Sequence, residues 1–446
     1  MKTPRIVLAT IGSLGDLHPF IAIALALKAR GASPVLAVPQ DHVEKCRAAG
    51  VEAEALLPTF EEVGRATGLD EDVVIRKVID DTHFLVSHVL LPPLADSTGR
   101  LLRIAAGADL LVGSAFALAG PIVAERLAIP FVSIILQPMS WFSPSDPPVA
   151  PGFAALARPP LGVIRTGWNR FVLGGAKLEM RRRYGRRVNR VRAAHGLARS
   201  HAAPILEPGT PPVLSLGTYS SELAALPAEA SNPALLTGFP WFDSADGMLS
   251  KLDPELAAFL AKGPPPLIVS LGSFLPFAAA DFYQRSAAIA AELGMRAVLL
   301  TGEAVTAPSR DMMVCGYAPH SLLFPYAAAI IHHGGVGTTG QALRAGKPQL
   351  VVPFMGDQFD HADRIARLGV GLSMTPGRFA TEGASLIQRL LDHPGFSTTA
   401  ATIGKRVANE DGAGLAAERI LGLLPTTRRH PVAWQGDTPS SISANI

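Results

Sequence analysis

The chain lacks most of the features that mark secreted, membrane-spanning or nucleic-acid-binding proteins. Its two cysteines, Cys46 and Cys315, show no spacing pattern, which excludes a disulfide framework or a cysteine metal site and fits a reducing cytoplasm. The longest apolar runs, such as Ile129 to Leu136, fall short of the ~20 residues that a membrane span needs. A net charge of +3 gives no overall sign of nucleic-acid binding.

Acidic clusters of the kind that hold metal ions are also scarce. The one D-x-D string, Asp70-Glu71-Asp72, lies in a polar stretch of the N-terminal half and reads best as a solvated helix face. A strand-like run from Arg5 to Ala9 leaves no room for a signal peptide. We therefore expect a metal-independent, cytoplasmic protein.

One segment, residues 177–192, is strongly basic, with eight cationic side chains and one acid. Such a segment forms either a solvated helix face or a contact with an anionic membrane surface. The sequence leaves both open, and association with the inner face of the membrane stays an alternative to a purely cytoplasmic protein.

The abundant feature is apolar sequence in short runs. Hydrophobic residues make up 48% of the 446 residues and the mean hydropathy is +0.28, which predicts large cores and, at this length, two domains. Strand-like runs alternate with helices in both halves, a pattern typical of α/β proteins with doubly wound parallel sheets. One of the helices is expected from Pro19 to Arg30. We expect the N-terminal domain at 1–222, a linker at 223–236, the C-terminal domain at 237–424 and a flexible tail at 425–446.

The most informative stretch is residues 326–358. A strand-like run, Ala327 to Ile331, leads into two histidines and a glycine-rich turn. A helix (Gln341 to Ala345), a second strand (Gln349 to Val352) and the pair Asp357-Gln358 follow. This order predicts a β-α-β unit whose glycine turn meets a helix N-terminus, where bare N–H groups and the helix dipole suit phosphate.

The same turn has the spacing of a dinucleotide fingerprint. Gly335, Gly337 and Gly340 read G-x-G-x-x-G, and Asp360 lies twenty residues past the last glycine, which is compatible with NAD. The imidazoles before the turn favour a different chemistry, in which a diphosphate gathers negative charge as it leaves. An NAD-dependent oxidoreductase therefore remains the alternative.

These residues bring out a family resemblance. HHGGVGTT, ALRAGKPQLVVPF and GDQ resemble the nucleotide-sugar signature of the UDP-glycosyltransferase superfamily, the GT-B glycosyltransferases. GSLGDLHP at 12–19 resembles the acceptor-side turn, while SLGS at 270–273 and GYAPH at 316–320 resemble donor-domain loops. TGFPWFD at 237–243 and residues 357–371 resemble the bacterial branch of the rhamnolipid-forming rhamnosyltransferase B chain. The resemblance implies two Rossmann-like domains that face each other across a cleft.

The resemblance also implies a donor site in the second domain. His333 corresponds to the donor histidine, whereas strand alternation points His332 the opposite way. Asp357 and Gln358 would bind sugar hydroxyls, although a helix N-cap is the plain alternative for Asp357. The remaining donor-binding candidates, each with turn or loop packing as its alternative, are Ser273, Tyr317, His320, Gly335, Gly337, Thr338 and Thr339.

The acceptor side centres on Asp16. In plant members of the family a histidine oriented by a distant acid holds this position, whereas here Asp16 replaces it and Ser114 stands near the place of the acid. A carboxylate can accept a hydroxyl proton directly. The nearby helix N-terminus should keep Asp16 ionised but weakly basic, and a simple N-cap is the alternative. His18 is the competing base.

The acceptor itself is expected to be apolar. His18, Trp141 and Phe142 are the candidate acceptor-binding residues, the last two in a proline-rich loop that either walls a pocket or simply packs. Together these features predict an inverting, metal-independent hexosyltransferase that uses dTDP- or UDP-hexose as co-substrate and no cofactor. A catalytically silent subunit that binds a lipid or a partner chain is the second alternative.

Overall fold

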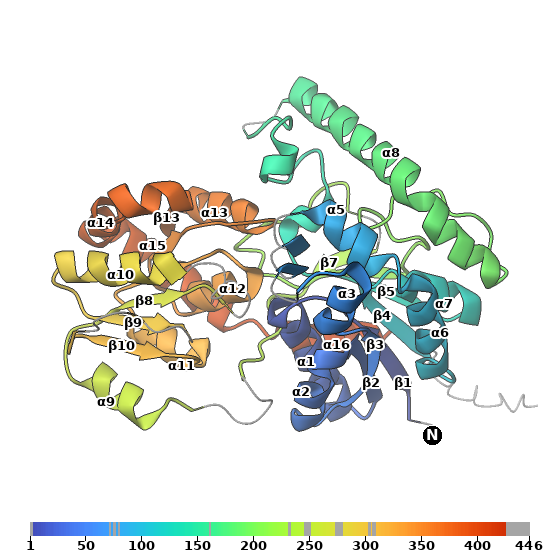
Figure 1. Cartoon of the computed structure of the whole chain (residues 1–446), viewed down its shortest axis with the longest axis horizontal. Coiled ribbons are helices and arrows are strands. Elements are labelled where there is room, and N and C mark those ends of the chain that lie inside the picture. The colour runs from blue at the N-terminus through green and yellow to red at the C-terminus, as the bar shows by residue number, and fades with distance from the viewer. Residues whose placement is uncertain are drawn as a thin grey trace, which may run out of the picture.

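The computed structural model describes residues 3–70, 73–74, 77–78, 81–159, 162–230, 233–244, 251–272, 280–301, 305 and 309–424. They form two α/β domains side by side, the first with its sheet in blue, cyan and, for its last strands, green, and the second with its sheet in yellow and orange (Figure 1). Every strand pair in both sheets is parallel, as the short apolar runs between helices predict.

In the described part of the first domain, the sheet has seven strands in the order β3-β2-β1-β4-β5-β6-β7. The strands are β1 (Arg5–Ala9), β2 (Ser33–Pro39), β3 (Glu52–Leu57), β4 (Leu110–Ser114), β5 (Phe131–Ile135), β6 (Leu214–Gly217) and β7 (Ala234–Leu236). The helices are α1 (Leu14–Ala29), α2 (Val43–Ala48), α3 (Phe60–Thr67), α5 (Thr82–Phe84), α6 (Leu94–Ile104), α7 (Ala119–Leu127) and α8 (Val163–Ala194). Alternate residues of β1 enter opposite cores, because Ile6 and Leu8 pack toward α1 and Val7 toward α6 and α7.

The second sheet, in the residues described, has six strands in the order β10-β9-β8-β11-β12-β13. The strands are β8 (Leu267–Ser270), β9 (Ala297–Leu300), β10 (Met312–Cys315), β11 (Ala329–His332), β12 (Gln349–Val351) and β13 (Gly371–Ser373). The helices are α9 (Pro254–Ala261), α10 (Ala280–Glu292), α11 (His320–Leu323), α12 (Val336–Arg344), α13 (Gln358–Arg367), α14 (Pro376–Asp392), α15 (Pro394–Ala408) and α16 (Gly412–Leu421). None of the helices in the described ranges is long and apolar enough to cross a membrane.

Three local features differ from the expectations. The first helix begins at Leu14, one turn before the expected start at Pro19, because Ser13 caps it and Pro19 is accommodated inside. The expected linker 223–236 ends in β7, which pairs with β6 at the edge of the first sheet. The last helix, α16, returns to the first domain, where Ala416, Ala417 and Ile420 are fully buried beside α1 (Figure 1).

Candidate active site between the two domains

Asp16 lies in the first turn of α1, just past the carboxyl end of β1. The Ser13 side chain accepts a hydrogen bond from the helix backbone, and Asp16 Oδ2 accepts one from Ser13 N–H at 3.0 Å, which completes a capping box. Gly12 has a φ of 138°, and a Cβ on it would lie 2.1 Å from Asp16 Oδ2. Only glycine therefore fits where the carboxylate lies against the preceding turn.

The Asp16 carboxylate is less acidic than a surface aspartate. Burial raises its pKa to about 7, and the negative charge of Asp357 in the second domain acts in the same direction. Backbone hydrogen bonds from Ser13 and Asp16 itself oppose this increase. The expectation of a firmly ionised, weakly basic Asp16 is therefore wrong, because it considered the helix N-terminus but not the burial of the carboxylate or, secondarily, the charge of Asp357.

His18 also faces the second domain. Its ring meets the edge of Phe242 with centroids 5.2 Å apart, and its Nε2 is buried without a hydrogen-bond partner among the described residues. Burial lowers the His18 pKa to about 3, helped by the cationic Lys45 and by His320. His18 is therefore neutral at physiological pH and a much weaker base than Asp16.

The glycine turn after β11 opens into the N-terminus of α12. Gly335 is the N-cap, and among the described residues no side chain caps this helix end. The first backbone N–H groups, including those of Gly337 and Thr338, are therefore available to an anion. The Thr339 hydroxyl is buried with no partner in the described chain. This is the geometry expected of a diphosphate site.

The two histidines before this turn have different surroundings. Gly334 N–H donates to His332 Nδ1 at 3.1 Å, so His332 Nε2 carries the proton and donates to Gln349 Oε1 at 2.9 Å. His333 packs on the other side against Gly272, where a Cβ would lie 2.8 Å from its ring. His333 Nδ1 is buried without a partner in the described residues. His332 therefore has a structural role, while His333 keeps a ring nitrogen for a ligand.

Burial keeps both rings neutral. It lowers the pKa of His332 to about 4 and that of His333 to about 3, and the proximity of the two rings contributes to the shift at His333. In the free enzyme His333 therefore carries no positive charge. A neutral imidazole carries one N–H. With that proton on Nδ1, the nitrogen without a partner in the described residues, His333 can donate a hydrogen bond to an anionic diphosphate in place of its interaction with the Ser270 backbone.

Tyr317 and His320 flank this site at the start of α11. His320 Nε2 lies 3.2 Å from Ser270 Oγ, and its ring stacks on Phe324 with centroids 4.3 Å apart. Burial lowers the His320 pKa, although Asp243 opposes this. Tyr317 is 43% exposed and its hydroxyl donates to Asp243 Oδ1 at 3.2 Å. The Tyr317 ring therefore lies at the rim of the candidate donor site, where it is open to stacking by a nucleobase.

Asp357 is the N-cap residue of α13, but its side chain makes no capping hydrogen bond to described residues. Burial raises its pKa, while His361, whose Nδ1 lies 3.7 Å from Asp357 Oδ2, opposes the increase. Gln358 uses its carbonyl within the protein, where it accepts from Phe354 N–H at 2.8 Å and Met355 N–H at 3.1 Å. A sugar hydroxyl could therefore donate a hydrogen bond to the Asp357 carboxylate. Gln358 could offer a sugar only its amide NH₂, because its carbonyl is already used.

His361 is a candidate that the sequence interpretation missed. It is fully buried, and its Nδ1 lies 2.7 Å from the Gly334 carbonyl, so Nδ1 carries the proton. Its Nε2 is buried without a partner in the described chain and is therefore available to a ligand. The available signal was the spacing of Asp357 and His361, which places both on one face of a helix.

Asp360 contradicts the dinucleotide alternative. It is fully buried, where it accepts from Arg364 Nε at 2.7 Å and from Val149 N–H at 3.1 Å. Arg364 also pairs with Asp146 of the first domain at 2.9 Å. An acid used in this way cannot bind a ribose, and it instead joins the two domains.

Of the aromatic acceptor candidates, Trp141 borders a cavity of about 190 Å³ in the first domain. Its indole N–H donates to the Tyr219 hydroxyl at 2.8 Å. Phe142 has a positive φ of 47° and packs near Phe153, with centroids 6.0 Å apart. Phe142 is not among the residues that line the cavity, in the part of the chain described.

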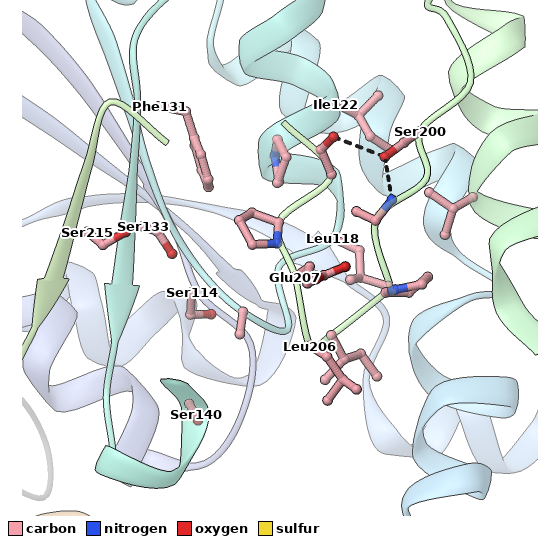
Figure 2. A pocket seen from close by; sticks show the side chains of 18 of the residues that line it. Ser114, Leu118, Ile122, Phe131, Ser133, Ser140, Ser200, Leu206, Glu207 and Ser215 are labelled. Carbon is pink, nitrogen blue, oxygen red and sulfur yellow. Dashed lines mark hydrogen bonds between the residues drawn. The ribbon is translucent and has the colours of Figure 1, made fainter. Parts of the chain in front are cut away.

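The cavity is lined by strands of the first sheet, by α7 and α8, and by the segment 200–209. Figure 2 shows Ser114, Ser133 and Ser215 on three strands, with Leu118 and Ile122 opposite them. Ser114 Oγ accepts from Thr10 Oγ1 at 3.3 Å, so one residue that lines the cavity contacts the residue that directly follows β1. Its volume is below the usual range for a whole ligand, so it fits part of an acceptor.

Two expected site features remain outside this description. Ser273 is not among the described residues, and neither are Glu71 and Asp72 of the D-x-D string. Among the described residues, no group of three or more His, Cys, Asp or Glu could hold a metal ion.

Two Rossmann-like domains with an anion site facing an aspartate define the GT-B class of glycosyltransferases. Residues 296–417 match the family described as Erythromycin biosynthesis protein CIII-like, C-terminal domain. The vancomycin aglycone glucosyltransferase of Amycolatopsis orientalis is 30% identical, over 94% of this chain and 97% of that protein. The chain therefore belongs to the UDP-glycosyltransferase superfamily and is a nucleotide-sugar-dependent glycosyltransferase.

Other similar proteins are also glycosyltransferases. The O-mycaminosyltylonolide 6-deoxyallosyltransferase of Streptomyces fradiae is 29% identical over 92% of this chain and 94% of that protein. The structure of the spinosyn rhamnosyltransferase SpnG complexed with thymidine diphosphate has a TM-score of 0.63 and 18% identity, and covers 94% of this chain and 100% of that chain. Membership of the superfamily removes the oxidoreductase and the silent subunit as readings, whereas the narrower resemblance to the rhamnolipid-forming branch stays a prediction.

Proposed function

We propose that the protein transfers a hexose from a nucleotide diphosphate sugar to a hydroxyl of an apolar small molecule, with inversion and without a metal. The proposal depends above all on Asp16, a carboxylate of the first domain whose pKa is raised by burial and, to a smaller extent, by the charge of Asp357 in the second domain. A group with a pKa of about 7 is suited to take up a proton near neutral pH.

The reaction follows from the positions of the two sites. Asp16 accepts the proton of the acceptor hydroxyl as the acceptor oxygen forms a bond to the anomeric carbon. The bond from that carbon to the diphosphate breaks, and the electron pair leaves with the nucleoside diphosphate. Attack from the side opposite the diphosphate inverts the anomeric centre.

The leaving group is stabilised at α12. Its open N-terminus offers backbone N–H groups and the positive end of the helix dipole, and His333 adds a neutral donor. Asp357, Gln358 and His361 hold the sugar hydroxyls. Tyr317 at the rim contacts the nucleobase.

For the donor we favour dTDP-rhamnose or UDP-glucose, because relatives carry the names glucosyltransferase and rhamnosyltransferase and one is complexed with thymidine diphosphate. For the acceptor, the partly apolar cavity beside Ser114 supports a hydroxy lipid, a polyphenol or a similar molecule.

The test combines nucleotide binding with product stereochemistry. Thermal shifts of the full chain are measured with UDP, dTDP, GDP and NAD, and a purified product is analysed by NMR. We expect UDP or dTDP to stabilise the fold most and the product linkage to have the anomeric configuration opposite to that of the donor. A retained configuration would refute the single-displacement mechanism.

A further inference from the structure

Helix α8 carries a stripe of large apolar side chains on its outer side. Ile164, Trp168, Phe171 and Leu178 follow one another at intervals of four, three and seven residues, which places them along one face of a helix. They are 89%, 49%, 73% and 45% exposed. Apolar surface gathered in this way marks an interaction site more often than scattered apolar residues do.

The opposite face of α8 attaches the helix to the domain. Asn169, Leu173 and Tyr184 are buried there, and Asn169 donates to the Pro144 carbonyl at 3.1 Å. Figure 1 shows α8 along the outside of the first domain, with its first turns standing clear of both sheets. These buried residues fix the rotation of α8, so the stripe points away from the domain.

The charge of α8 differs from that of the rest of the protein. Ten of the 40 Lys and Arg residues lie in this helix, but only one of the 37 acidic residues, Glu179, does. The helix therefore carries a net charge of +9, and the remainder of the chain carries −6. An anionic surface would attract α8 and repel the rest, which orients the protein with the stripe toward that surface.

The basic part continues the apolar stripe. Arg182 and Arg186 follow Leu178 at helical intervals of four, on the same face. Together with Arg199 and His201 they line a hollow of about 470 Å³ beside α8. Within the described chain neither Arg182 nor Arg186 has an acidic partner, so the hollow suits an anionic headgroup.

We propose that α8 docks on an anionic lipid bilayer. Ile164 and Phe171 enter the boundary between headgroups and acyl chains, while Arg182 and Arg186 contact lipid phosphates. A nucleic acid would leave the apolar stripe in water, and a second copy of α8 would bring two helices of +9 together. This inference does not depend on the proposed donor, acceptor or base.

The experiment uses vesicle co-sedimentation of the full chain. Wild type should pellet with vesicles of phosphatidylcholine and phosphatidylglycerol, much less with phosphatidylcholine alone, and less as salt is raised. Two double variants remove one contribution each: I164S with F171S, and R182Q with R186Q. Each should weaken partitioning at least tenfold.

Matched controls change the same chemistry elsewhere on the surface. V213S with Y326S removes two exposed apolar side chains, and R310Q with R389Q removes two charges. Both controls should bind vesicles as wild type does. All variants should keep the melting temperature and the nucleotide affinity of wild type.

Several outcomes would overturn the proposal. They are failure of wild type to pellet with anionic vesicles, equal binding to neutral vesicles, and equal losses in the α8 variants and their controls. Retention by a DNA duplex without vesicle binding would identify a nucleic-acid surface instead. A dimer in solution that dissociates when the stripe is substituted would identify the stripe as a subunit interface.

Discussion

The two domains use the same local unit, a strand, a tight turn and a helix, for opposite purposes. After β1, Ser13 and Asp16 cap the N-terminus of α1, so that end is satisfied by the protein itself. After β11, the N-terminus of α12 begins at Gly335 without a side-chain cap among the described residues. The first unit holds a carboxylate in place, and the second leaves its N–H groups to a ligand.

Burial acts on the two units in opposite directions. It raises the pKa of Asp16 to about 7 and lowers that of His333 to about 3, because it disfavours the charged form of each. In the proposed mechanism, the first domain thus supplies a base that works near neutral pH, and the second supplies a neutral hydrogen-bond donor. We therefore expect substitutions at Asp16 to affect proton transfer from the acceptor hydroxyl, and substitutions at His333 to affect the leaving diphosphate.

The largest expected effect follows substitution D16N. The amide keeps the size of the carboxylate and still accepts the capping hydrogen bond, but it cannot take up a proton. Turnover should fall about 10²–10⁴-fold, with dTDP or UDP affinity nearly unchanged. Steady-state transfer assays and nucleotide titrations of the same preparation measure both quantities.

S13A is the matched control, because it removes the other half of the capping box. It should cost ~1 kcal/mol in the free energy of unfolding and leave turnover nearly intact. If D16N keeps turnover within about threefold of wild type, Asp16 acts only as a cap. His18 would then be the base to test.

The next effect is expected for H333A on the donor side. Loss of a hydrogen bond to a charged diphosphate costs ~1.5–3 kcal/mol, which corresponds to a drop of about tenfold to about 150-fold in kcat/KM. Circular dichroism should show an intact fold. H393A, at an exposed position between α14 and α15, is the control, and wild-type activity in H333A would refute the donor assignment.

Substitution D357N tests the coupling between the two sides. Ionised Asp357 makes ionisation of Asp16 harder, so its removal should lower the pKa of Asp16. The acceptor hydroxyl needs the ionised form of Asp16, so wild-type kcat/KM should rise through a midpoint near pH 7. In D357N the midpoint should move to lower pH, and an unmoved midpoint would show that the two groups do not interact.

The smallest expected effect is that of chelation. Turnover should be the same before and after EDTA, because backbone N–H groups and His333 are proposed to stabilise the leaving group. If EDTA abolished activity and Mg²⁺ restored it, a cation would be the group that stabilises the leaving diphosphate. Activity in EDTA with added Ca²⁺ controls for effects of the chelator itself.

The sequence allowed the β-α-β unit of β11, α12 and β12 to be predicted because its signal is local. The glycines after β11, the opposite directions of His332 and His333, and the position of Asp357 all follow from one stretch of chain and from strand alternation. The parallel sheets were also predictable, because strands buried on both faces read as short apolar runs. These features depend on near neighbours along the chain.

Features set by distant contacts could not be predicted in this way. The pKa of Asp16 depends first on burial and then on the charge of Asp357, which lies 341 residues further along the chain and acts on Asp16 only in the folded protein. Asp360 has the spacing of a ribose-binding acid, but Arg364 and Val149 occupy it. Spacing reveals which residues are candidates, whereas packing decides which of them stay free.

The return of α16 to the first domain has a consequence for engineering. In a glycosyltransferase with two domains, a chimaera can join the acceptor-binding domain of one parent to the donor-binding domain of another. Here a single junction near β7 would separate α1 from the helix that completes its core, because Ala416, Ala417 and Ile420 fill that core from the far end of the chain. A chimaera of this protein therefore needs two junctions, with α1 and α16 taken from the same parent.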